Sequence, residues 1–184
     1  MSACLSDSDT ELDALIALFH QLFADSLNTV LVKGSDEPIY LPADDSHPQH
    51  RIIFAHGFYA SALHEIAHWC VAGEQRRQLP DYGYWYKPDG RSADEQAEFE
   101  RVEVTPQAYE WILTIASGRS FHFSADNLGG GFGPSVQFQQ RVLAKVTNLL
   151  TEGLPSRLNS LVSALCQQNG RSLPSADEFH LSRQ

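Results

Sequence analysis

The residues best suited to carry out chemistry lie in the segment His64-Glu65-Ile66-Ala67-His68, which places two histidines four positions apart. Residues i and i+4 share one face of an α-helix, so both imidazoles can bind one metal ion if the segment is helical. Ser61 before it and Gly73 after it are typical capping residues, and they predict a helix over residues 61–72. The alternative is that His64 and His68 are buried structural residues, each satisfied by a backbone carbonyl.

Two histidines leave a first-row metal short of protein ligands, and a carboxylate is the usual third. Glu100 and Glu103 stand three residues apart on a predicted helix over residues 92–104, so they share nearly one face. Glu103 lies between two valines and is the more conspicuous charge in an apolar setting. Glu100 is the second candidate, and either side chain could instead be solvated.

Three other features are weaker candidates. His56 could support the metal ligands from just upstream, although a single histidine at the end of a strand is more often structural. The aromatic run over residues 82–86 could line a cleft, but such runs more often pack in a core. The glycine-rich run over residues 129–133 lacks the Lys-Ser/Thr pair and the preceding strand of a phosphate loop, which favours a mobile loop or lid.

Hydrophobic spacing predicts the elements that must position these residues. Short β-type runs predict strands at residues 29–32, 39–41, 51–55 and 82–86. Helical spacing predicts helices at residues 12–23, 92–104, 106–118, 135–150 and 156–165, with Pro106 kinking or restarting the chain, and a short last turn at 175–178. Because the strands cluster in the first half with helices before, within and after them, we expect an α+β fold in one domain over residues 1–184.

Composition limits the class of partner. The 184 residues carry 23 acidic side chains against 13 Lys and Arg, a formal net charge of −10. This charge argues against direct binding of nucleic acid and favours a basic partner. Three scattered cysteines suggest neither a disulfide framework nor a cysteine zinc site, and there is no secretory signal or apolar run of membrane-spanning length. We therefore expect a cytoplasmic protein without a membrane partner.

Four longer strings resemble the bacterial elongation factor P hydroxylase family: residues 36–42 (DEPIYLP), 54–70 (FAHGFYASALHEIAHWC), 82–91 (YGYWYKPDGR) and 99–108 (FERVEVTPQA). The His64–His68 motif alone is shared with many zinc proteases, but these strings are specific. The resemblance extends over about residues 10–165.

The resemblance implies a zincin-like α+β domain of about five helices and a small sheet, with a metal site of two histidines and one carboxylate. It implies an iron-dependent monooxygenase that uses molecular oxygen and hydroxylates the β-lysylated lysine of elongation factor P. The family's histidines fall on His64 and His68, and the carboxylate is placed on Glu103, with Glu100 as the fallback. In this hypothesis Glu65 is a catalytic-site residue that orients a ligand or the bound oxygen.

Two other hypotheses remain open. In a zinc peptidase, Glu65 would be the general base that activates metal-bound water. In a non-catalytic binding domain, the histidines would be structural. The ligand set suits Fe(II) and zinc equally, so residue types do not choose the metal, and they identify neither the reductant nor the oligomeric state.

Overall fold

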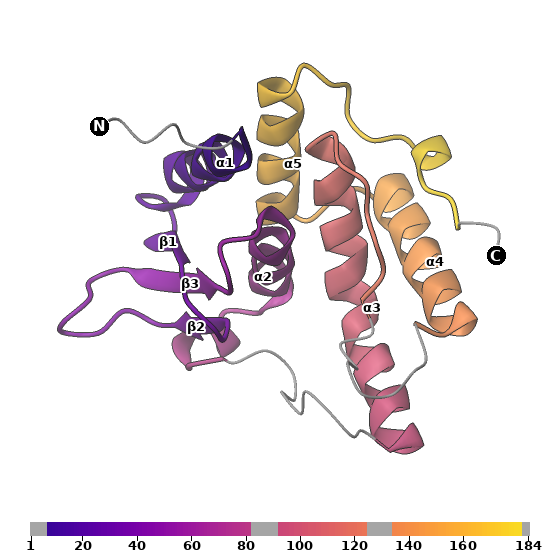
Figure 1. The fold of residues 1–184 in the computed structure, drawn as a ribbon, viewed down its shortest axis with the longest axis horizontal. Helices are drawn as coiled ribbons and strands as arrows, with labels where there is room; N and C mark the ends of the chain where they lie inside the picture. The colour runs from indigo at the N-terminus through magenta and orange to yellow at the C-terminus, as the bar shows by residue number, and fades with distance from the viewer. Residues whose placement is uncertain (1–6, 82–91, 125–133, 182–184) are drawn as a thin grey trace. The chain divides into compact units, whose positions relative to one another are not determined.

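The computed structural model describes residues 7–81, 92–124 and 134–181. Within these ranges the chain forms five α-helices and a three-stranded sheet, which confirms the α+β class (Figure 1). The chain divides into two compact units, Met1–Gly83 and Tyr84–Gln184, which are described separately. The predicted strand at residues 82–86 and the glycine-rich run at 129–133 lie outside the described residues.

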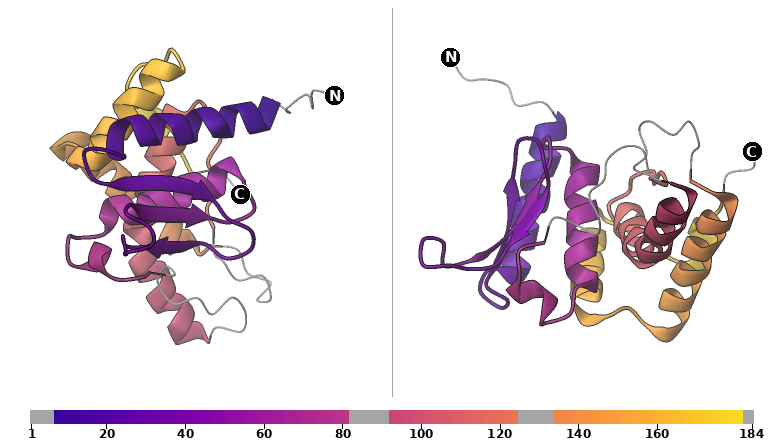
Figure 2. Two further views of the ribbon diagram at one scale, coloured as in Figure 1. Left: turned by 90° about the vertical axis from the view of Figure 1, so that its left-hand side faces the viewer. Right: turned by 90° about the horizontal axis from the view of Figure 1, so that it is seen from below.

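The first unit is a small mixed sheet with two helices. The sheet has the order β1-β3-β2, in which β1 (Thr29–Lys33) pairs parallel with β3 (His50–Phe54) and β2 (Ile39–Leu41) pairs antiparallel with β3. α2 (Tyr59–Val71) covers one face of the sheet and α1 (Asp7–Phe23) runs along its β1 edge (Figure 2). The carboxyl ends of β1 and β3 therefore lie on the same side of the sheet, and from there the chain enters α2.

The core of the first unit joins α1 to α2. Phe19 and Phe23 pack edge-on against Trp69, with ring centroids 5.3 and 5.0 Å from the tryptophan. Buried apolar residues from both helices and the sheet complete it: Leu12, Leu15, Leu31, Ile52, Phe54, Leu63 and Ile66. This packing fixes which face of α2 turns inward and leaves its histidine face half-buried.

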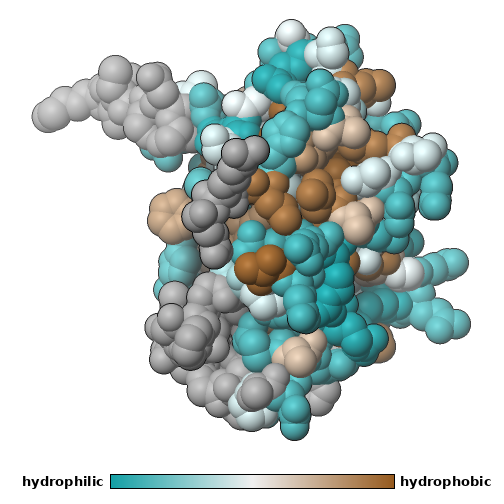
Figure 3. Space-filling view, turned by 90° about the vertical axis from the view of Figure 1, so that its right-hand side faces the viewer, coloured by the Kyte–Doolittle hydropathy of each residue, from teal (hydrophilic) through white to brown (hydrophobic). Residues whose placement is uncertain are grey.

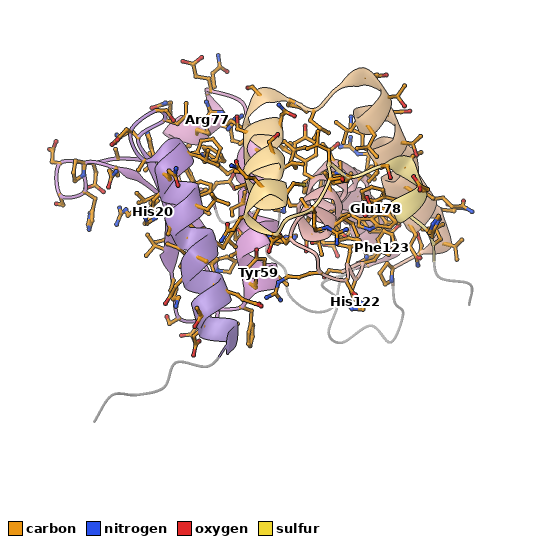
Figure 4. The ribbon with its side chains drawn as sticks, turned by 90° about the horizontal axis from the view of Figure 1, so that it is seen from above. His20, Tyr59, Arg77, His122, Phe123 and Glu178 are labelled. Atoms are coloured by element: carbon orange, nitrogen blue, oxygen red, sulfur yellow. The ribbon has the colours of Figure 1, made fainter. Side chains whose placement is uncertain are left out.

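The second unit is helical. α3 (Ala93–Ala116) packs against α4 (Val136–Glu152) and α5 (Ser156–Gln168). Trp111 of α3 stacks on Phe121 at 5.0 Å and meets Phe179 edge-on at 5.3 Å. Phe123, which is labelled in Figure 4, meets Phe138 of α4 at 6.4 Å. These aromatic contacts hold the segments that follow α3 and α5 against the helices.

Several predicted boundaries need correction. α3 is one continuous helix with Pro106 inside it, so the restart that the sequence predicted as one of two outcomes at this proline does not occur. α1 begins at Asp7, five residues before the predicted start at residue 12. α2 begins at Tyr59 with Phe58 as N-cap, so Ser61 lies within the helix and is not its cap. Both helices therefore begin earlier in the chain than their predicted starts at residues 12 and 61.

On the face that carries α4, apolar side chains gather in the centre and hydrophilic ones surround them (Figure 3). Among the described residues, no helix has the length and apolar character needed to cross a membrane.

Candidate metal centre

α2 places its two histidines one turn apart on one face. Nε2 of His68 lies 3.1 Å from Nε2 of His64, and the ring centroids are 4.6 Å apart with the planes at 66°. Both side chains are half-buried. The two ring nitrogens thus point toward each other, as the i, i+4 spacing predicted.

The separation of the two nitrogens tests whether they suit a common ion. A metal–imidazole bond is about 2.1 Å long, so two nitrogens 3.1 Å apart on one ion would subtend an angle of about 95°. That angle falls between the right angle of an octahedral site and the wider angle of a tetrahedral one. The histidine pair therefore fits as two adjacent ligands of one first-row metal, and its geometry does not choose between iron and zinc.

Glu103 lies in the second unit, on α3, and is buried with 2% of its surface exposed. It is flanked on the same helical face by two other buried polar residues, Glu100 at 7% and Gln107 at 1% exposure. Burial of a carboxylate is costly unless a cation or hydrogen bonds compensate it. The solvated alternative for both glutamates is thereby excluded.

Glu100 uses both carboxylate oxygens to hold the start of α4. The Ser135 amide donates to Oε1 at 3.2 Å, and the Ser135 hydroxyl donates to Oε2 at 2.7 Å. Ser135 is the N-cap of α4, and its Oγ accepts from the Phe138 amide at 3.1 Å. Glu100 therefore has a structural role that occupies both of its oxygens.

Gln107 was not among the sequence candidates. Its Nε2 donates to the Ser124 carbonyl at 2.7 Å, and the Ser124 amide donates to its Oε1 at 3.3 Å. The side-chain amide thus binds the backbone of Ser124 at two points. The available signal was its position four residues after Glu103, which extends the same face of α3 by one more turn.

The remaining sequence candidates lie in the first unit. Glu65 is half-buried on α2, next to His64. His56 is exposed, and its backbone amide donates to the Ser35 carbonyl at 3.1 Å. It lies in the connection between β3 and α2, outside the histidine pair.

This chain is similar to one protein family and to a curated relative. A sequence model of the family described as elongation factor P hydroxylase matches residues 18–179. The "Elongation factor P lysine hydroxylase" of Haemophilus influenzae (strain ATCC 51907 / DSM 11121 / KW20 / Rd) is 56% identical over 155 residues, which cover 84% of this chain and 87% of the relative. Residues 18–179 contain the histidine pair and both glutamate candidates.

Proposed function

The chain belongs to the elongation factor P hydroxylase family, a family of oxidoreductases, and we propose that it hydroxylates a lysine of elongation factor P. The observation that carries this proposal is the match to a lysine hydroxylase over most of both chains. We propose further that the target lysine carries a β-lysyl group. A cytoplasmic location belongs to the same proposal, because translation takes place there.

We propose that His64, His68 and Glu103 bind one Fe(II) ion in a zincin-like site. Each residue offers one ligand atom of a type that binds first-row metals. Two neutral nitrogens and one carboxylate, with the other positions open, suit non-haem iron. Because the family match over residues 18–179 includes residues of both units, we also propose that residues 1–184 work as one domain.

Each residue has a defined part in this proposal. His64 and His68 present Nε2 to the ion, and the 3.1 Å separation of these atoms supports that role. Glu103 supplies a negative charge in a buried setting, where Glu100 is already occupied by Ser135. Glu65 orients a ligand from its place beside His64. When bound, the iron supplies the activation of molecular oxygen, of which one atom enters a C–H bond and the other leaves as water with electrons and protons from a reductant.

The comparisons do not support the zinc peptidase alternative, because both name hydroxylases. The resemblance of this chain to zinc proteases is limited to the His64–His68 motif. No observation of the fold favours it over the hydroxylase.

The test is the mass of β-lysylated elongation factor P after incubation with the protein, ferrous iron, air and a reductant. We expect a gain of one oxygen atom, which His64→Ala abolishes together with metal binding. The matched control is His122→Ala, which changes an exposed histidine of the second unit (Figure 4) and should leave the gain intact. An unchanged mass with iron bound and reductant present contradicts the proposal, and a gain that survives His64→Ala contradicts the site.

A further inference from the structure

The connection between β3 and α2 exposes an aromatic pair just before the histidine helix. Phe58 is 65% exposed, and its ring centroid lies 6.0 Å from that of the exposed His56. We call His56 and Phe58 the aromatic corner. Tyr59 follows Phe58 and marks the start of α2 in Figure 4. Single exposed apolar residues are common on proteins, so the surroundings of the corner decide whether it has a role.

The backbone of the corner is held in an unusual conformation. His56 has φ 55° and Gly57 has φ 66°, so two successive residues are left-handed. A left-handed residue other than glycine is strained, and such residues gather at functional sites. The fold therefore holds Phe58 outward by a conformation that costs stability.

An acidic turn, Asp36 and Glu37, lies beside the corner. The His56 amide binds the Ser35 carbonyl, and the Gly34 amide binds the Phe54 carbonyl at 2.9 Å. A Cβ at Gly34 would lie only 2.6 Å from Cγ2 of Ile53, so this glycine allows the close approach. Because β1 and β3 are parallel, the acidic turn after β1 and the corner after β3 both lie at the carboxyl ends of these strands.

The surface at the carboxyl ends of β1 and β3 carries negative charge from Asp36 and Glu37. Asp36 and Glu37 are exposed, and neither has an ion-pair partner among the residues that the structure describes. Residues 34–38 and 55–63 contain no Lys or Arg, and the preceding Lys33 is paired with Asp13 at 2.7 Å. An aromatic face flanked by carboxylates binds alkylammonium groups by cation–π and charge-assisted contacts.

Resting on the proposed function, we propose that the aromatic corner with Asp36 and Glu37 is the docking surface for the lysine-bearing loop of elongation factor P. The β-lysyl extension of that lysine carries two ammonium groups, which match the charge and the aromatic face. Phe58 precedes His64 by six residues, about 9 Å along the helix axis. A protein docked on the corner thus holds its modified side chain close to the histidine pair.

The test measures the dissociation constant and the steady-state kinetics with β-lysylated elongation factor P. Phe58→Ala should raise Kd and KM about tenfold while changing kcat by less than about twofold. Asp36→Asn combined with Glu37→Gln should raise KM and weaken its dependence on salt. Iron content should match that of the unaltered protein in every variant.

Two controls match the changes in kind. Leu79→Ala removes another exposed apolar side chain of the first unit, which is 63% exposed. Asp25→Asn combined with Asp45→Asn removes two exposed charges of the same unit. Neither should raise KM as the corner variants do.

The outcomes separate this inference from the proposed function. If the protein hydroxylates its substrate but Phe58→Ala and the double variant behave like their controls, the docking surface is overturned and the function stands. If the unaltered protein binds β-lysylated elongation factor P without hydroxylating it, and the corner variants bind more weakly, the surface stands and the function fails. Absence of binding by the unaltered protein overturns the surface.

Discussion

Glu100 and Glu103 lie one turn apart on α3 and are both buried. Glu100 accepts two hydrogen bonds from Ser135 and so completes the start of α4. This role was not foreseeable from spacing, because Ser135 follows 35 residues later in the chain. It favours Glu103 over Glu100 as the proposed ligand.

The two glutamates therefore give a matched pair of variants. Glu103→Gln should lower iron affinity at least about tenfold, because it removes a charged ligand. Glu100→Gln should retain iron and lower the free energy of unfolding by about 1 kcal/mol, because one hydrogen bond to a charged oxygen is weakened. Iron titration and urea unfolding of both variants measure the two effects, and the opposite pattern would move the ligand to Glu100.

His50 predicts a dependence of stability on pH. Burial, and then the nearby Arg77 charge, lower the pKa of His50 from its ordinary value of 6.5. Its Nδ1 accepts from the Ala43 amide at 3.0 Å, which requires the unprotonated nitrogen. Below the ordinary value the unfolded chain takes up a proton that the folded chain resists, so stability is complete above about pH 6.5 and declines as the pH falls toward the lowered pKa.

The measurement is urea unfolding at pH values from 7.5 down to about 5, on the unaltered protein and on His50→Gln. We expect the variant to be less stable at pH 7.5 but to lose less stability on acidification, because the titrating group is gone. Parallel curves for the two proteins would contradict a contribution from His50.

At the scale of the elements, the connection from β3 to α2 depends on a left-handed glycine. A Cβ built on Gly57 meets nothing within 4 Å, and the same holds for Gly73 after α2, but only Gly57 of the two has a positive φ, 66°. Gly57→Ala should therefore lower the free energy of unfolding by about 1–2 kcal/mol through its backbone alone. Gly73→Ala is the matched control, and urea unfolding should show little loss or a small gain. Equal losses would show that φ is not the cause.

Prediction of the elements succeeded where a short pattern determines the structure. Residues 39–41 form the predicted strand. The strand predicted at 29–32 extends one residue further, and the strand predicted at 51–55 lies one residue earlier in the chain, at 50–54. α3 was less predictable, because Pro106 is a helix breaker in isolation but here lies buried within a helix packed against α4 and α5.

In the candidate site, too, the local pattern was predictable and the long-range contacts were not. The i, i+4 histidines need only one helix, so the sequence alone suffices for them. The bonds from Gln107 to Ser124 and from Glu100 to Ser135 connect residues 17 and 35 positions apart, and no local pattern encodes such distances.

At the scale of the whole molecule, charge is divided unequally along the chain. Residues 1–83 contain 12 Asp and Glu against 4 Lys and Arg, a formal charge of −8, and residues 84–184 contain 11 against 9, a charge of −2. The unit that carries the histidines is therefore strongly acidic. A cationic substrate would be attracted to it over a range set by the ionic strength.

This charge predicts the effect of salt on the proposed reaction. The kcat/KM for β-lysylated elongation factor P should fall about tenfold between about 0.01 and 0.15 M ionic strength, because long-range attraction accelerates encounter. At saturating substrate, kcat should change little. Stopped assays at fixed pH across a salt series measure both, and a kcat/KM that does not depend on salt would rule out electrostatic steering.

The β1 edge of the sheet has one further feature. The Asn28 carbonyl and the Gly34 amide bind β3, so by alternation the amide and carbonyl of Leu31 point away from the sheet. His20 of α1, labelled in Figure 4, meets them: the Leu31 amide donates to its Nε2 at 3.1 Å, and the Leu31 carbonyl lies 3.0 Å from the same nitrogen. An imidazole at this position blocks the addition of a strand from another molecule. We therefore expect that replacing His20 with an apolar residue causes aggregation before it prevents folding. The first sign would be turbidity at high protein concentration.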